Sequence, residues 1–247
     1  LLKDMIFGAD GTVIYDDQGQ KSLMGDVITV NGVPWPRMEV ANRKYRFRLC
    51  NGSVSRSYRL ALSNGAKFTM IGTDEGLMGA PVDVADFRIG MAERYEFVID
   101  FSKYPVGTQI VLNNLQPSNN INYDGTDIVM RFDVVRKEAD SSVVPSKLRP
   151  YPLIAESSAV RNREFRYERT NGLWVINGKT WEVDRFDANP ELGDTEIWTL
   201  YNNAGGWFHP VHIHLIDMQI LDRNGQPPFA YERSRRYRRN TIQPITS

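Results

Sequence analysis

The sequence is poor in the side chains that build disulfide frameworks and zinc clusters. Its 247 residues contain one cysteine, Cys50, and three histidines. A single thiol can form neither an internal disulfide nor a cluster of zinc thiolates, so small disulfide-stapled and zinc-ribbon folds are excluded. We interpret Cys50 as a small buried apolar residue in preference to a reactive thiol.

Net charge and long apolar runs are missing as well. The 30 lysines and arginines are balanced by 30 aspartates and glutamates, so no overall field attracts a polyanion, and we expect no nucleic-acid partner. No run of about 18 apolar residues is present, and we expect no membrane span. The chain starts at Leu1 without a methionine or a signal-peptide pattern. This start predicts that the sequence begins inside a longer polypeptide.

Short β-rich segments separated by turn residues fill the chain. Apolar and polar residues alternate in these segments, as is typical of half-buried strands, and Asn-Gly pairs follow three of them, at 31–32, 51–52 and 64–65. No long helical period competes with this pattern. The sequence therefore predicts an all-β sandwich protein, with strands at residues 27–30, 45–49, 58–62, 94–100, 109–112 and 128–135.

A short repeat indicates two copies of one β domain. Residues 28–35 read Ile-Thr-Val-Asn-Gly-Val-Pro-Trp, and residues 174–181 read Trp-Val-Ile-Asn-Gly-Lys-Thr-Trp. A strand that ends in asparagine follows each of them, at 45–51 and 196–202. Two copies of one domain explain the match most economically. Coincidence among common strand and turn residues is the alternative.

A stretch rich in proline and serine separates the two copies. It contains Pro145, Pro150 and Pro152, and this composition is typical of an extended linker. We predict a first domain at residues 1–137, a linker at 138–164 and a second domain at 165–247. The second copy has fewer residues after its repeat than the first, so we expect an incomplete sandwich with an unclosed sheet edge.

All three histidines lie within one six-residue window, at His209, His212 and His214. On a β-strand, His212 and His214 would project to one face and His209 to the other. Imidazole is a common ligand of copper, zinc, iron and nickel. One strand can therefore serve two metal centres, although histidines in a purely structural role are the alternative. Zinc is disfavoured because cysteine and carboxylate partners are scarce nearby.

Residues 206–221 read Gly-Trp-Phe-His-Pro-Val-His-Ile-His-Leu-Ile-Asp-Met-Gln-Ile-Leu. This segment closely resembles the start of the copper-binding C-terminal domain of multicopper oxidases, particularly the subgroup of bilirubin oxidases and spore-coat laccases. Residues 25–36, 43–48 and 92–101 are similar to the middle domain of that subgroup. The resemblance covers most of the chain and is weakest in the linker and after Tyr231.

The resemblance implies tandem cupredoxin-like Greek-key β-sandwiches, of which the second is incomplete. Residues 1–137 would be a middle domain without copper ligands, and residues 165–247 the beginning of the C-terminal copper-binding domain. By position, His209 matches the ligand of the type 1 blue copper, His212 that of the type 2 copper and His214 that of one copper of the type 3 pair. Trp207 would lie where electrons enter, with a core aromatic as the alternative.

The resemblance further implies an oxidoreductase that uses copper and dioxygen. Such an enzyme oxidises a small-molecule reducing substrate, phenolic or tetrapyrrole, one electron at a time at the blue copper and reduces dioxygen to water at the trinuclear cluster. The family's usual secretion predicts an extracellular location. A relative that oxidises metal ions would need acidic residues near the blue copper, and Asp217, Asp222 and Glu232 are too few to indicate one.

The sequence departs from the family pattern in its ligand set. A blue copper site needs a thiolate, and Cys50 ends a strand of the middle domain, where the family has no ligand. The other histidine pairs of the family are absent. We therefore predict that this chain alone neither holds four coppers nor turns over substrate. A non-catalytic sandwich that binds at most one metal is the alternative reading.

Three further motifs have structural explanations. Asn51-Gly52-Ser53 fits the glycosylation sequon, but a tight turn explains it sufficiently. Glu93 and Arg94 precede a strand, and we interpret them as a scaffold ion pair or turn. Arginines at 233, 235, 236, 238 and 239 could dock an acidic substrate group, although we favour a solvated loop.

Overall fold

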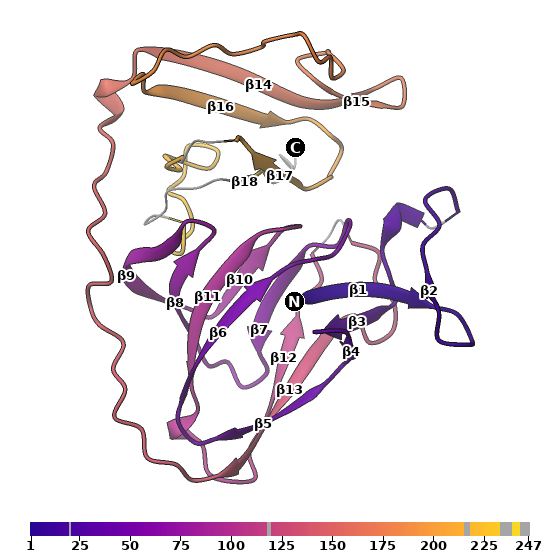
Figure 1. Cartoon of the computed structure of the whole chain (residues 1–247), viewed down its shortest axis with the longest axis vertical. Coiled ribbons are helices and arrows are strands. Elements are labelled where there is room, and N and C mark those ends of the chain that lie inside the picture. Colours follow the sequence, from indigo (N-terminus) through magenta and orange to yellow (C-terminus); the bar gives the residue numbers. More distant parts are fainter. Residues whose placement is uncertain (20, 118–119, 215–217, 233–238, 243–247) are drawn as a thin grey trace. The chain divides into compact units, whose positions relative to one another are not determined.

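The computed structural model describes residues 1–19, 21–117, 120–214, 218–232 and 239–242. Strands and three short 3-10 helices, η1 (Lys21–Leu23), η2 (Phe101–Lys103) and η3 (Glu156–Ser158), are the regular elements of these ranges (Figure 1). The described residues contain no helix of the length and hydropathy needed to cross a membrane. The predicted all-β class is confirmed.

The chain folds as two compact units within the described ranges. The first unit comprises Leu1–Tyr151 and His212–Arg239, and the second comprises Pro152–Val211 and Asn240–Ser247. The change of unit between Tyr151 and Pro152 falls inside the predicted linker, although the last four residues of that linker, 161–164, belong to β14. The predicted domain limits at 137 and 165 remain a prediction.

Two facing sheets and a smaller third sheet build the first unit (Figure 1). One sheet of the sandwich has the strand order β10-β7-β12-β13-β5, namely Asp86–Ile89, Tyr58–Leu62, Gln109–Asn114, Ile128–Arg136 and Arg37–Ala41. The other has the order β6-β11-β8-β9, namely Lys44–Cys50, Arg94–Asp100, Phe68–Thr73 and Gly76–Val84. The small sheet has the order β2-β1-β3-β4, namely Val13–Ile14, Leu2–Phe7, Val27–Val30 and Val33–Pro34.

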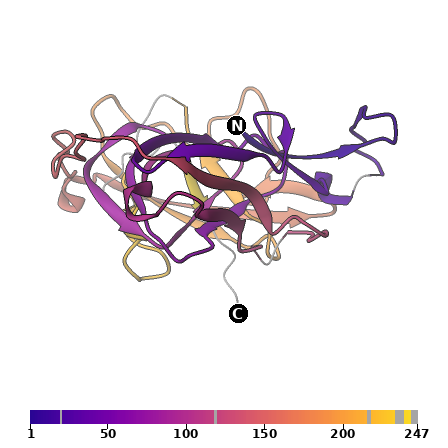
Figure 2. The same cartoon turned by 90° about the horizontal axis from the view of Figure 1, so that it is seen from below.

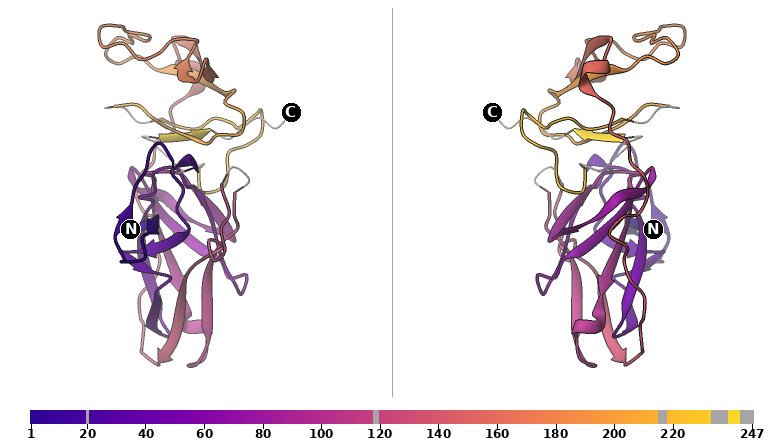
Figure 3. Two further views of the ribbon diagram at one scale, coloured as in Figure 1. Left: turned by 90° about the vertical axis from the view of Figure 1, so that its right-hand side faces the viewer. Right: turned by 90° about the vertical axis from the view of Figure 1, so that its left-hand side faces the viewer.

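The strands predicted for this unit are all present. Residues 27–30, 58–62 and 94–100 match β3, β7 and β11 to the residue, and the other three predicted strands extend by one or two residues. Every pairing within the two large sheets is antiparallel except that of β13 with β5. Figure 2 and Figure 3 show the strands of this unit arranged in layers.

Aromatic rings from the two large sheets meet between them and form the core. Phe87 of β10 lies 5.1 Å from Phe68 of β8 and 5.5 Å from Phe97 of β11 between ring centroids. Phe132 of β13 lies 5.4 Å from Phe47 of β6. Rings at such distances add edge-to-face attraction to the burial of apolar area. The alternation in the sequence therefore places one face of each sheet in a shared core.

The second unit contains a three-stranded sheet and most of a short strand pair. The sheet has the order β15-β14-β16, namely Leu173–Ile176, Arg161–Thr170 and Glu196–Asn202. Strand β14 pairs in parallel with β16 and antiparallel with β15 (Figure 1). Strand β17 (His209–His212) pairs with β18 (Arg239–Ile242).

The two copies of the repeat form the same turn. Asn31 and Asn177 both have a φ of 52°, and the glycines that follow them have φ values of 84° and 73°. Two consecutive residues with positive φ are typical of the tight turn that joins hairpin strands. In the first copy Val30 pairs with Val33, and in the second Ile176 pairs with Lys179. The match in sequence is therefore also a match in backbone conformation.

Candidate metal centre

The loop before β17 fixes where the histidine strand begins. Gly205 and Gly206 adopt φ values of 64° and 97°, which side chains with a Cβ rarely adopt. The Asn202 side-chain amide, at the end of β16, donates a hydrogen bond of 2.7 Å to the Trp207 carbonyl oxygen. The turn therefore reverses the chain and anchors it two residues before His209.

His209, at the start of β17, is half-buried among aromatic rings of the second unit. Its ring stacks on Tyr167 at 5.9 Å between centroids and meets the edge of Trp174 at 5.1 Å. Its Nε2 atom is buried and has no hydrogen-bond partner among the described residues. Burial lowers the pKa of His209 below its ordinary value. The site therefore favours the neutral imidazole, which is the form that binds metals.

Trp207 and Trp174 extend this aromatic cluster. The two indole rings lie 6.0 Å apart in an edge-to-face arrangement, so Trp174 contacts both Trp207 and His209. The Arg169 guanidinium lies 5.4 Å from the Trp174 ring. Burial raises the pKa of Tyr167 to about 12, so its phenol is neutral at ordinary pH. Tyr167, Trp174, Trp207 and His209 form what we call the aromatic cluster.

His212 and His214 form a separate pair. Their rings lie 4.8 Å apart between centroids, and both residues are exposed. Strand β17 ends at His212, so the expectation that one strand carries all three histidines holds only for His209 and His212. The two rings nevertheless lie close together, and their assignment to a type 2 and a type 3 copper stays a prediction. The division of the histidines into one and two is therefore present in the structure.

The described part of the chain supplies an incomplete set of metal ligands. It contains no group of three or more His, Cys, Asp or Glu side chains placed to hold one metal ion. The unpartnered Nε2 of His209 and the paired rings of His212 and His214 suit copper, which imidazole binds well. Any copper held by these imidazoles therefore needs further ligands besides them.

Cys50 lies in the β6-β11-β8-β9 sheet of the first unit. It ends β6 and stands opposite Arg94 of β11. The side chain is partly exposed, which corrects the interpretation of a buried apolar residue.

The remaining sequence motifs have structural roles where they are described. The Asn51 side chain is fully buried and donates a hydrogen bond of 2.9 Å to the Arg56 carbonyl oxygen, so the sequon acts as a turn. The buried Glu93 carboxylate accepts a hydrogen bond from the Gly90 N–H at 2.5 Å. Arg94 pairs with Asp74 at 3.0 Å. The arginines at 233, 235, 236 and 238 and Asp217 lie outside the described residues, as does the side chain of Arg239.

The two acidic residues described near the C-terminus are engaged in local contacts. The Glu232 carboxylate is buried and binds the Arg223 guanidinium, with a distance of 2.7 Å between Oε2 and Nε. The Asp222 carboxylate accepts a hydrogen bond from the Gly225 N–H at 2.9 Å. Both carboxylates therefore have hydrogen-bond partners within the protein and need no bound metal ion to balance them.

Comparison with protein families matches both parts of the chain to one family. Two family models, each described as multicopper oxidase, match residues 6–128 and residues 154–245. Bilirubin oxidase from Albifimbria verrucaria is 40% identical over 94% of this chain and 44% of its own length. A laccase from Bacillus subtilis (strain 168) is 32% identical over 95% of this chain and 49% of its own length. The chain thus spans about half the length of the curated relatives it matches.

Solved structures give the same result for the fold. The McoA multicopper oxidase from Aquifex aeolicus superposes with a TM-score of 0.86 at 31% identity, covering 99% of this chain and 56% of that one. Multicopper oxidases are built of cupredoxin-like β-sandwiches, so the predicted sandwich class is confirmed. The matches to both family models, the curated relatives and the solved structure agree, and the chain belongs to the multicopper oxidase family.

Proposed function

We propose that this chain is part of a copper oxidase that takes single electrons from a small-molecule reducing substrate and passes them to dioxygen. The observation that carries the proposal is the division of the histidines. His209 lies half-buried in the aromatic cluster with Nε2 unpartnered, and His212 and His214 form a separate exposed pair. An oxidase that separates electron uptake from oxygen reduction needs two such centres.

The proposal assigns each histidine to one copper. His209 would bind a type 1 copper, His212 a type 2 copper and His214 one copper of a type 3 pair. Bound copper supplies one-electron redox chemistry, and water formation requires four electrons and four protons for each dioxygen. The chain contributes ring orientation, because Tyr167 and Trp174 fix the plane of His209, and it holds that imidazole neutral by burial.

Trp207 is proposed as the residue where electrons enter. It lies edge-to-face with Trp174, which in turn lies edge-to-face with His209, so the three rings form a continuous row. The substrate would be phenolic or a tetrapyrrole, since two relatives are named bilirubin oxidase and laccase. The Asp222 and Glu232 carboxylates have other partners, so they give no support to a metal-ion substrate.

The ligand count limits what the chain does by itself. A blue copper needs a thiolate together with imidazoles, and the sequence offers one cysteine, which ends β6 of the first unit. Three histidines cannot complete four copper sites. We therefore expect the 247-residue chain to lack oxidase turnover, with the missing ligands supplied by other polypeptide. An extracellular location is part of the proposal and is tested by fractionating the natural source.

Electron paramagnetic resonance of the copper-loaded natural protein tests the assignment. His209→Gln should abolish the type 1 signal and leave the type 2 signal. His212→Gln should do the reverse, and it serves as the matched control because it makes the same chemical change three residues away. If neither substitution alters either signal, the non-catalytic sandwich becomes the better explanation.

A further inference from the structure

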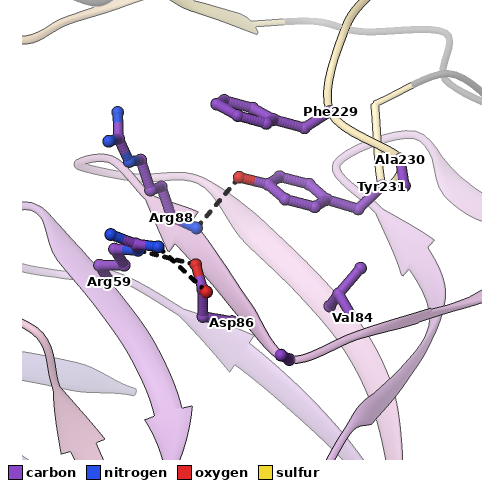
Figure 4. A pocket seen from close by; sticks show the side chains of 8 residues that line it. Arg59, Val84, Asp86, Arg88, Phe229, Ala230 and Tyr231 are labelled. Atoms are coloured by element: carbon purple, nitrogen blue, oxygen red, sulfur yellow. Dashed lines mark hydrogen bonds and ion pairs between the residues drawn. The ribbon is translucent and has the colours of Figure 1, made fainter.

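An open pocket of about 370 Å³ lies in the first unit, and none of the three histidines lines it. Strand β7 contributes Arg59, β10 contributes Asp86 and Arg88, and the segment after β17 contributes Phe229 and Tyr231. Figure 4 shows the two arginine side chains on one side and the two rings on the other. A volume of this size suits a small molecule, since such sites span roughly 300–1,000 Å³.

Tyr231 fixes the aromatic wall of the pocket. Its side chain is buried, and its ring lies 6.4 Å from Phe87 and 6.0 Å from Tyr95 between centroids. Its hydroxyl oxygen accepts a hydrogen bond of 3.2 Å from the Arg88 backbone N–H (Figure 4). Phe229 stacks on Tyr231 at 5.5 Å with an interplanar angle of 10°. The wall is therefore docked onto β10 and held by the core of the unit.

The charges in the pocket do not cancel. Arg59 and Asp86 neutralise each other through two hydrogen bonds, of 2.7 and 3.1 Å. Arg223, whose charge also reaches Arg88, is paired with Glu232. The Arg88 guanidinium lies 5.8 Å from the Phe229 ring, and no described carboxylate lies within ion-pair distance of it. Among the residues that the structure describes, the pocket thus contains one partly buried cation without a counter-ion.

The surroundings of Arg88 make its positive charge costly. Burial lowers the pKa of the Arg88 guanidinium, and the charges of Arg59 and Arg223 act in the same direction. Tyr231 and Asp86 act in the opposite direction. An arginine remains charged at ordinary pH in any case. An anion that enters the pocket would therefore relieve an unfavourable interaction as well as form new hydrogen bonds.

We propose that this pocket binds a small oxyanion on the guanidinium of Arg88. A guanidinium presents parallel N–H groups that match the oxygens of a carboxylate or a phosphate. Asp86 does not compete for the ligand's place, because both of its oxygens bind Arg59. The Phe229 and Tyr231 rings offer an apolar wall to an organic carboxylate, whereas inorganic phosphate would use the guanidinium alone.

Isothermal titration calorimetry of the 247-residue chain tests the proposal. Sodium phosphate and sodium benzoate are titrated separately at pH 7 with the ionic strength held constant by chloride. We expect one-site binding of at least one of them, weakened about tenfold or more in Arg88→Gln, because a charge-assisted bidentate contact is lost. Arg48→Gln removes the same charge from a side chain that is 77% exposed, and it should leave the affinity unchanged.

Each outcome bears on the proposal. Binding of phosphate alone identifies an inorganic anion, and tighter binding of benzoate identifies an organic carboxylate. If the wild-type chain shows no saturable binding of either anion, or if Arg88→Gln binds as well as the wild type, the proposal is wrong. If circular dichroism shows that Arg88→Gln is unfolded, Arg88→Lys replaces it as the test variant. Lysine keeps the positive charge but lacks the parallel N–H groups of the guanidinium. Anion binding by Arg88→Lys as tight as that of the wild type would also overturn the proposal.

Discussion

The fully buried ion pair between Arg56 and Asp4 offers a sharp test of how the small sheet is attached to the sandwich. Asp4 lies on β1, and Arg56 precedes β7. The Arg56 Nε atom lies 2.9 Å from Asp4 Oδ2, and the two side chains are 0% and 1% exposed. Arg56 Nη2 also donates to the Gly25 carbonyl oxygen at 2.7 Å, while the Gly25 N–H donates to Asp4 Oδ2 at 2.7 Å. One guanidinium therefore joins β1 and the segment around Gly25 to the chain just before β7 of the sandwich.

Replacement of Arg56 by methionine should be strongly destabilising. Methionine fills most of the volume, but it leaves the Asp4 carboxylate buried without its cation. Removing one partner of a buried pair costs about 3–5 kcal/mol, because the remaining charge is uncompensated. Folded proteins have a free energy of unfolding of about 5–15 kcal/mol, so the loss is a large part of the total. Urea denaturation followed by circular dichroism at 25 °C measures it.

Two further variants separate pairing from packing. Arg46→Met removes a cation that pairs with Glu96 and is 48% exposed, and an exposed pair is worth about 1 kcal/mol or less. The double variant Asp4→Leu with Arg56→Met should be less destabilised than Arg56→Met alone, because no charge is left buried. If Arg56→Met costs no more than Arg46→Met, the ion pair does not attach the small sheet.

Three other changes have clear expected results. Phe87→Ala removes one of the rings that pack between the two large sheets and should lower the free energy of unfolding by about 3–5 kcal/mol in urea denaturation. Asn177→Ala removes the carboxamide that binds the Arg166 N–H and the Glu164 carbonyl oxygen, at a φ of 52° that alanine adopts less readily than asparagine, and a loss of about 1–2 kcal/mol is expected by the same assay. Hydrogen bonds from Arg163 and Trp198 lower the pKa of Glu196 to about 2 from 4.5, so this carboxylate stabilises the fold above pH 4.5 and ceases to do so as the pH falls towards 2. The free energy of unfolding should therefore fall less between pH 6 and pH 2 in Arg163→Met than in the wild type. An equal dependence of the free energy of unfolding on pH in the two proteins would contradict this.

Strand positions in the first unit follow from the sequence where alternation and turn residues agree. Residues 58–62 and 94–100 alternate between apolar and polar side chains, and they form β7 and β11 as predicted. Strand β14 could not be predicted in the same way. Its ten residues are mostly charged or polar, and its first residues fell inside the predicted linker. It is a strand because β15 and β16 pair with both of its edges, which no local pattern reveals.

The three histidines of the candidate metal centre are evident from the sequence, and their role as ligands stays a prediction, whereas their surroundings could not be predicted. Three histidines in six residues stand out in a chain that has no other histidine. Tyr167 and Trp174 were not identified as neighbours of His209, although Trp174 opens the second copy of the repeat. Their placement depends on the β14–β15 hairpin, where Tyr167 pairs with Ile176 and Arg169 pairs with Trp174. Strand pairing at a distance therefore decides which rings enclose the ligand.

Copper content, measured together with intact mass on the protein purified from its natural source, tests the central claim most directly. If His209, His212 and His214 are copper ligands of an oxidase, elemental analysis should find about four coppers on a polypeptide much heavier than 28.3 kDa. Essentially no copper on a polypeptide of 28.3 kDa would contradict the claim and leave the histidines without a metal.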